Sequence, residues 1–158
     1  MKIPTLIKLI IAILISEIIG GIGSIFTIPS IGKWYATLVR PEMVPPNWIF
    51  GPVWVTLFAL MGIASYLVWQ KGLGDKKVRI ALIFFIIQFV LNILWSFVFF
   101  GLHNPGLAFA EIIILWLAIL STTLSFYRVS KEAGYLLVPY ILWVSFAGYL
   151  NYMIWTLN

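Results

Sequence analysis

The sequence predicts an all-α membrane protein, a bundle of five transmembrane helices with a long loop between the first and second helices that covers a pocket. Three observations support this prediction. Of the 158 residues, 63% are hydrophobic and only 9% are charged, whereas a soluble domain has roughly 25% charged residues. Five apolar stretches are each long enough to cross a bilayer as a helix, which takes about 20 residues. The connection after the first stretch is long and rich in proline and aromatic residues.

The five spans form a single domain that covers residues 1–158. We expect them at residues 6–28, 48–69, 80–100, 107–126 and 135–155. The connections after the second, third and fourth spans are short and contain the glycine, proline and polar residues that interrupt helices. Pro139 lies inside the fifth span, and we expect it to kink that helix.

The connection between the first two spans, residues 29–47, differs from the others. It contains four prolines and two large aromatic residues, namely Pro29, Pro41, Pro45, Pro46, Trp34 and Tyr35. A long loop with its own aromatic side chains is more typical of a functional lid than of a flexible linker. We therefore expect this loop to cover a pocket.

The positive charge reports membrane topology. The net charge is +5, but the basic residues cluster between apolar spans, a pattern that argues against nucleic acid as a partner. One side of the bundle collects eight of them, Lys2, Lys8, Lys71, Lys76, Lys77, Arg79, Arg128 and Lys131, and the other side only Lys33 and Arg40. Because short cytoplasmic segments are enriched in Lys and Arg, we expect the N-terminus to be cytoplasmic. The membrane that we expect is the plasma membrane of a prokaryote.

Three spans carry stripes that mix aromatic and hydrogen-bonding side chains. The members are Trp54, Phe58, Met61 and Ser65 in the second span, Gln88, Asn92, Trp95 and Phe99 in the third, and Trp143, Ala147 and Asn151 in the fifth. Each set recurs every three or four residues, so it shares one helix face. Because lipid offers an amide no hydrogen-bond partner, the stripes should face one another. They either serve interhelical packing alone or line a cavity for a flat aromatic ligand.

Two carboxyl groups also fall within spans. Glu17 and Glu111 suggest either transport of protons or ions or a structural role. Glu111 is near the expected start of its helix, where the helix dipole favours a carboxylate. Ser16, Gly20 and Ser24 form a ridge of small residues that allows another helix to approach closely.

Neither a metal site nor a bound cofactor is expected. The chain has no cysteine and one histidine. His103 stands in a turn without a second ligand at metal-binding spacing. His103 is therefore not expected to serve as the axial ligand of a haem.

Several motifs occur in a fixed order along the chain. Residues 34–48 read WYATLVRPEMVPPNW, residues 50–54 read FGPVW, residues 91–96 read LNILWS, and residues 139–147 read PYILWVSFA. In order and content these motifs resemble those of the TspO/MBR family, which includes tryptophan-rich sensory proteins and the translocator protein, also called the peripheral-type benzodiazepine receptor. The resemblance covers the chain from about residue 20 onward.

This resemblance implies five helices around a pocket under the long loop, in a homodimer. It implies protoporphyrin IX or a related tetrapyrrole as ligand or substrate, with isoquinoline-type and benzodiazepine-type drugs as further ligands. The ligand-binding residues implied are Tyr35, Trp54, Phe58, Asn92, Trp95, Trp143, Phe146 and Ala147. Trp54 and Trp143 would also support light-dependent porphyrin degradation, the one catalytic role that the family suggests.

The chain departs from the family pattern at two places. Met43 replaces the tryptophan that usually follows the basic residue and proline, here Arg40 and Pro41. No basic residue follows Tyr152 and Trp155, so the sterol motif of the animal members is missing. Two other functions remain open, a small transporter of porphyrins or other lipophilic molecules and a regulatory membrane scaffold.

Overall fold

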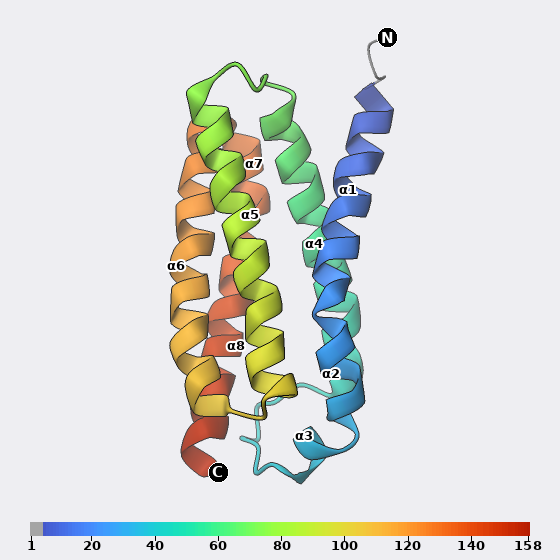
Figure 1. Ribbon diagram of the computed structural model, residues 1–158, viewed down its shortest axis with the longest axis vertical. Helices are drawn as coiled ribbons and strands as arrows, with labels where there is room; N and C mark the ends of the chain where they lie inside the picture. The colour runs from blue at the N-terminus through green and yellow to red at the C-terminus, as the bar shows by residue number, and fades with distance from the viewer. Residues whose placement is uncertain (1–4) are drawn as a thin grey trace.

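The computed structural model describes residues 5–158, and over these residues five helices are long and apolar enough to cross a membrane (Figure 1). The first is α1 (Thr5–Ile22), which is followed by α2 (Ser24–Ile31). The next three are α4 (Asn47–Trp69), α5 (Lys76–Ser96), which continues as a π-helical turn (Phe97–Gly101), and α6 (Pro105–Val129). The last combines α7 (Lys131–Leu136) with α8 (Val138–Leu157), and the short α3 (Trp34–Thr37) lies in the long connection. The predicted all-α bundle of five membrane-crossing helices is confirmed.

Two helices begin before the expected spans because polar residues cap their N-termini. The Asp75 side chain accepts a hydrogen bond of 2.8 Å from the backbone N–H of Lys77, so α5 begins in the basic segment ahead of residue 80. Asn104 caps α6 through the N–H of Leu107 at 3.0 Å. Hydropathy follows the bilayer core alone and therefore misses these polar ends.

The fifth span is interrupted at Leu137, as the proline in this region predicts. Helix α7 ends at Leu136 and α8 begins at Val138, which places Pro139 in the first turn of α8. Proline is well tolerated in a first turn, where its missing N–H would have no intrahelical acceptor. The hydrogen bond from Ile141 N to Leu137 O, 3.1 Å long, carries the backbone across the junction.

The helices pack so that α5 lies against α6, α6 against α8, and α1 against α4 at the edge of the bundle (Figure 1). The described start of α1, the connection from α4 to α5 and the junction of α6 with α7 lie at one end of the bundle. The C-terminus, α3 and the connection before α4 lie at the other end. The first end therefore holds Lys8 and the other basic residues assigned to it above, except Lys2, which is outside the described residues.

The core runs through α4 to α8. Among its fully buried side chains are Met61, Leu115, Ile119, Phe126 and Tyr140. Large apolar side chains such as Ile18, Ile28 and Leu142 point outward and are 64–70% exposed, as a lipid-facing surface requires. Because lipid is as apolar as the core, close packing and interhelical hydrogen bonds hold such helices together more than the hydrophobic effect does.

Small residues let α1 approach α4. A Cβ added at Gly62 would lie 2.5 Å from the Cα of Ile13 and 3.0 Å from the carbonyl oxygen of Ala12. The space beside Gly20 is filled by the ring of Phe58. Of the ridge of small residues predicted in the first span, Gly20 thus packs within the chain, against α4.

Candidate functional site

A cavity of about 490 Å³ lies among α1, α2, α4, α5 and α8, toward the end of the bundle that holds α3. Its wall is mostly apolar and unusually aromatic. The aromatic side chains that line it are Tyr35, Trp48, Phe50, Trp54, Phe58, Trp95, Phe99, Phe100 and Trp143.

Seven of the eight residues predicted to bind a ligand line this cavity: Tyr35, Trp54, Phe58, Asn92, Trp95, Trp143 and Ala147. Phe146 does not line it, and its ring packs beside that of Trp143 with 5.8 Å between ring centres. The members of the stripes on α4, α5 and α8 therefore line one space, except Met61, Ser65 and Gln88, which are buried in the core. That these residues bind a ligand stays a prediction.

The aromatic rings form flat walls. Trp54 stacks on Phe58 with 5.3 Å between ring centres and 26° between ring planes. On α5, Trp95 stacks in the same way on Phe99, at 5.2 Å. Phe50 meets Trp143 edge-on at 5.8 Å. Such faces offer a planar apolar ligand a large stacking area.

A buried hydrogen-bond network behind the wall joins α5 to α8. The hydroxyl of Tyr140 donates to Gln88 Oε1 at 2.8 Å and accepts from Asn92 Nδ2 at 3.1 Å. All three side chains are at least 96% buried. The network fixes Asn92, which is part of the cavity wall. The sequence stripes did not include Tyr140, although its position three residues before Trp143 places it on the same helix face.

A second interhelical contact involves the other end of the stripes. Trp95 Nε1 donates to Asn151 Oδ1 at 3.0 Å, and Asn151 Nδ2 donates to the carbonyl of Pro105 at 2.7 Å. Asn151 thereby connects α5, α6 and α8. Asn151 was predicted to need a partner within the membrane because it is an amide, and Trp95, an aromatic member of the stripe on α5, supplies one.

Some buried polar atoms have no hydrogen-bond partner in the described part of the chain. They are the indole nitrogen of Trp143, Gln88 Nε2, Ser16 Oγ and both carboxyl oxygens of Glu111. Glu111 lies six residues after the start of α6 at Pro105, two residues further from it than the expected span placed it. Glu111 therefore lies in the second turn, where the dipole of the helix end has little effect.

The remaining wall comes from α1 and α2, and sequence reasoning did not assign it to the site. Glu17, Gly20, Gly23, Ser24 and Thr27 line the cavity. The ridge of small residues in the first span could have indicated this wall, because small side chains leave space beside their own helix. Either a neighbouring helix or a cavity can occupy that space. The sequence could not show whether that room is filled by a helix or left open.

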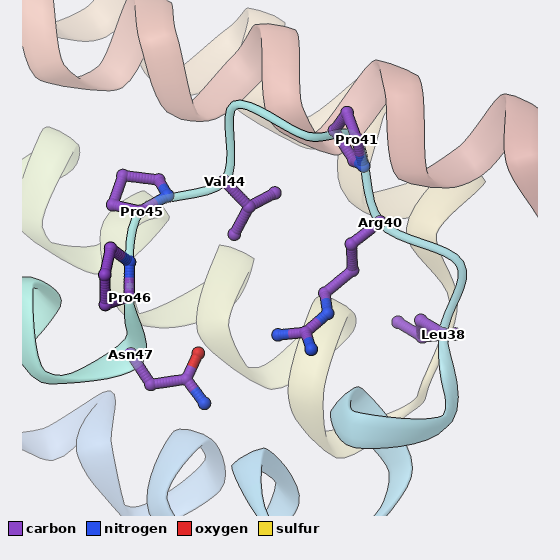
Figure 2. A pocket seen from close by; sticks show the side chains of 7 residues that line it. All are labelled: Leu38, Arg40, Pro41, Val44, Pro45, Pro46 and Asn47. Carbon is purple, nitrogen blue, oxygen red and sulfur yellow. The ribbon is translucent and has the colours of Figure 1, made fainter.

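The connection between α2 and α4 lines a groove of about 570 Å³ that shares Asn47 with the cavity. Figure 2 shows the loop arching from Leu38 to Asn47, with the side chains of Arg40, Val44 and Asn47 pointing into the space under the arch. The guanidinium of Arg40 lies 5.2 Å from the ring centre of Tyr35. Burial raises the pKa of the Tyr35 hydroxyl, and the neighbouring Arg40 opposes that rise.

His103 helps to hold this end of the bundle. Its ring stacks on Trp34 with 4.4 Å between centres, and its Nε2 lies 3.3 Å from Ser30 Oγ. It adopts a left-handed backbone conformation, with φ 54°. The histidine thus connects the turn before α6 to α2 and α3.

Comparisons with known proteins agree with this architecture. The TspO/MBR family profile matches residues 12–156. The chain is 46% identical over 140 residues to the tryptophan-rich protein TspO of Chlorobaculum tepidum, covering 89% of each chain. It is 43% identical to the protein of the same name from Archaeoglobus fulgidus, over 97% of this chain and 98% of the relative.

A relative from an animal is also similar. The human translocator protein is 40% identical over 127 residues, which is 80% of this chain and 75% of the relative. A profile match over nearly the whole chain and relatives of this similarity agree with five apolar helices. This multi-pass membrane protein therefore belongs to the TspO/MBR family.

Proposed function

We propose that this protein binds a flat tetrapyrrole such as protoporphyrin IX in the cavity among α1, α2, α4, α5 and α8. The observation that carries the proposal is the cavity wall, in which stacked aromatic faces surround a few fixed polar groups. A volume of about 490 Å³ falls within the roughly 300–1,000 Å³ typical of small-molecule sites. The ligand stacks on Trp54 and Trp143, while Asn92 supplies a positioned polar edge.

The connection between α2 and α4 acts as the lid of this site. Tyr35 in α3, Asn47 and Trp48 line the cavity, so the connection and the start of α4 form its outer wall. Trp48 is 75% exposed in this structure, which leaves its indole ring free to fold over a bound ligand. The prolines restrict the loop to few conformations, and this lowers the entropic cost of closing it.

Titration of the purified protein with protoporphyrin IX in detergent and in the dark tests the proposal. Quenching of tryptophan fluorescence follows binding in the wild type, Trp54→Phe and Trp143→Phe. Trp69→Phe is the matched control, because Trp69 lies at the far end of α4 outside the cavity, 5.6 Å from Lys8. Loss of one stacking tryptophan should weaken binding by about tenfold, given the ~0.5–1.5 kcal/mol of an aromatic pair and the buried area lost with it.

Saturable binding that is weakened only by the two cavity substitutions would support the site. Uniform partitioning into detergent, unchanged in all variants, would refute it. Illumination of the same samples tests the photochemical role of Trp54 and Trp143. New absorption bands that form in light with the wild type and fail to form in either variant are the result that this role predicts.

Transport is a second candidate, and one observation favours it. Glu17 places a carboxyl group in the cavity wall, within a membrane span, where ionisable residues often mark a transport path. Porphyrin flux into sealed liposomes that is lost in Glu17→Gln, with equilibrium binding retained, would favour transport. Flux equal to that of protein-free liposomes would exclude it.

A further inference from the structure

The loop groove and the aromatic cavity adjoin each other at Asn47. Asn47 lines both spaces. Arg40 lines the groove, and its guanidinium lies 5.2 Å from the ring centre of Tyr35, which lines the cavity. The loop end of the aromatic cavity therefore lies near Arg40 and Asn47, whose side chains both point under the arch of the loop (Figure 2).

Charge is distributed unequally along this site. Within the described chain, Arg40 is the one basic residue that lines either space, and Glu17 is the one acidic residue. Gly20, one helical turn beyond Glu17, faces Phe58, and Phe58 is eleven residues along α4 from Asn47. At 1.5 Å per residue, Phe58 and Gly20 lie roughly 16 Å deeper than Asn47, and Glu17 lies about one further helical turn away from the loop. The site is thus positive at its mouth, apolar along its walls and acidic at depth.

The backbone that carries Arg40 is held in place. The neighbouring Val39 exchanges two hydrogen bonds with the side chain of Asn158, from Val39 N to Oδ1 and from Nδ2 to the Val39 carbonyl, each 3.0 Å long. Pro41 follows Arg40 directly and restricts its backbone to extended conformations. The guanidinium therefore extends from a fixed point rather than from a freely moving loop.

An arginine fixed beside an amide has the donors that a carboxylate requires. A guanidinium matches a carboxylate with two parallel N–H···O hydrogen bonds, and the Asn47 amide can donate another. We propose that Arg40 and Asn47 form a carboxylate-binding subsite at the mouth of the cavity, so that the ligand is a flat aromatic acid with its acidic edge at the loop. This inference rests on the proposed function, and it fixes the ligand's orientation. Protoporphyrin IX fits, because its two propionates share one edge of the macrocycle.

The reverse orientation would bring the propionates to Glu17 and leave Arg40 without an anionic partner. A carboxyl group offers no opposite charge to a carboxylate. The apolar edge of the macrocycle instead suits the depth of the cavity, where Phe58 and Gly20 lie. Both ends of the site therefore select the same orientation.

The test compares protoporphyrin IX with its dimethyl ester, which has the same flat macrocycle but no anionic edge. Dissociation constants for both compounds are measured in detergent, in the dark, for the wild type, Arg40→Gln and Lys33→Gln. Lys33 is a matched control because it is a basic residue of the same connection but lines neither space. For each protein, the preference is the dissociation constant of the ester divided by that of the acid. This ratio should be about tenfold to a hundredfold larger in the wild type and in Lys33→Gln than in Arg40→Gln, the range expected for hydrogen bonds to a charged group.

The ester keeps this test independent of misfolding. If Arg40→Gln binds the ester as the wild type does and loses affinity only for the acid, the subsite is supported. Equal loss for acid and ester, or no loss for either, would overturn the subsite while leaving the proposed tetrapyrrole site intact. Absence of saturable binding of both compounds to the wild type would overturn the proposed function, and the subsite with it.

Discussion

Two tryptophans of the cavity differ in what their indole nitrogens do. Trp95 donates a 3.0 Å hydrogen bond to Asn151, whereas the buried nitrogen of Trp143 has no partner among the described residues. Trp95→Phe should therefore lower the free energy of unfolding by about 0.5–2 kcal/mol, the range of interhelical hydrogen bonds in membranes, and Trp143→Phe by clearly less. Thermal unfolding of both variants in one detergent measures the difference. Equal destabilisation would show that the Trp95 hydrogen bond contributes nothing.

The hydroxyl of Tyr140 supports the cavity wall from behind. Tyr140→Phe removes its hydrogen bonds with Gln88 and Asn92 and leaves two buried amides without this partner. We expect a loss of about 1–3 kcal/mol in unfolding free energy, because unpaired buried polar groups are costly. The matched control is Tyr149→Phe on the same helix, where the ring is 45% exposed. A Tyr140→Phe variant as stable as this control would contradict the structural role of the network.

At this scale, the sequence predicted which groups would need partners better than it predicted the partners. Gln88, Asn92 and Asn151 were singled out because an amide cannot remain unpaired in lipid. Periodicity places such residues on a face but does not show which side chain lies opposite. Tyr140 was therefore missed as the hub, and the lack of a hydrogen-bond partner for Glu111 among the described residues was not predicted.

The contact between α1 and α4 depends on a glycine. A Cβ at Gly62 would lie 2.5 Å from the Cα of Ile13, and backbone cannot yield as a flexible side chain can. Gly62→Ala should destabilise the protein by about 1–3 kcal/mol, the usual cost of overpacking. Gly51→Ala on the same helix meets nothing within 4 Å and should be neutral or stabilising, because alanine favours helix.

Comparison of the two melting temperatures in the same detergent checks this prediction. If Gly62→Ala had the same melting temperature as Gly51→Ala, α1 would be able to move away from α4 with no loss of stability. Helix α1 would then be held loosely at the edge of the bundle, contrary to the close approach in the structure.

Among the elements, the five membrane helices followed from apolar length, which the bilayer imposes directly. Their breaks did not follow from it. Helices α1 and α2 meet at Gly23, and α5 ends in a π-helical turn from Phe97 to Gly101. Both breaks lie within apolar sequence, where hydropathy does not change. Only the break near Pro139 had a local cause that the sequence could show.

The whole molecule has a basic end and an end that carries the candidate site. Because basic residues favour the cytoplasmic side, we expect the described start of α1 and the connection from α4 to α5 in the cytoplasm, with the loop groove on the opposite side. A reporter enzyme that is active only in the cytoplasm should be active when it is inserted after Gly74 and inactive when it is fused after Asn158. A reporter that is active only outside the cytoplasm should show the opposite pattern. The reverse pattern would contradict this topology.

At the same scale, three walls of the cavity could be predicted and one could not. The stripes on α4, α5 and α8 converge because their amides and aromatic rings avoid lipid. The wall from α1 and α2 consists of small residues, whose spacing reports close approach without showing what lies opposite. Volume also depends on packing in three dimensions, so the sequence could favour a cavity but not establish its size.

The central claim is that the cavity, rather than the detergent or the lipid-facing surface, holds the tetrapyrrole. The most direct measurement is the binding isotherm of protoporphyrin IX to the wild type, Ala147→Phe and Ala110→Phe in the dark. Ala147 lines the cavity, so a phenyl ring there fills part of it, whereas Ala110 is exposed on α6 and lines neither space. We predict one saturable site per chain in the wild type and Ala110→Phe, and its loss in Ala147→Phe with the fold retained. Identical isotherms for all three proteins would contradict the account.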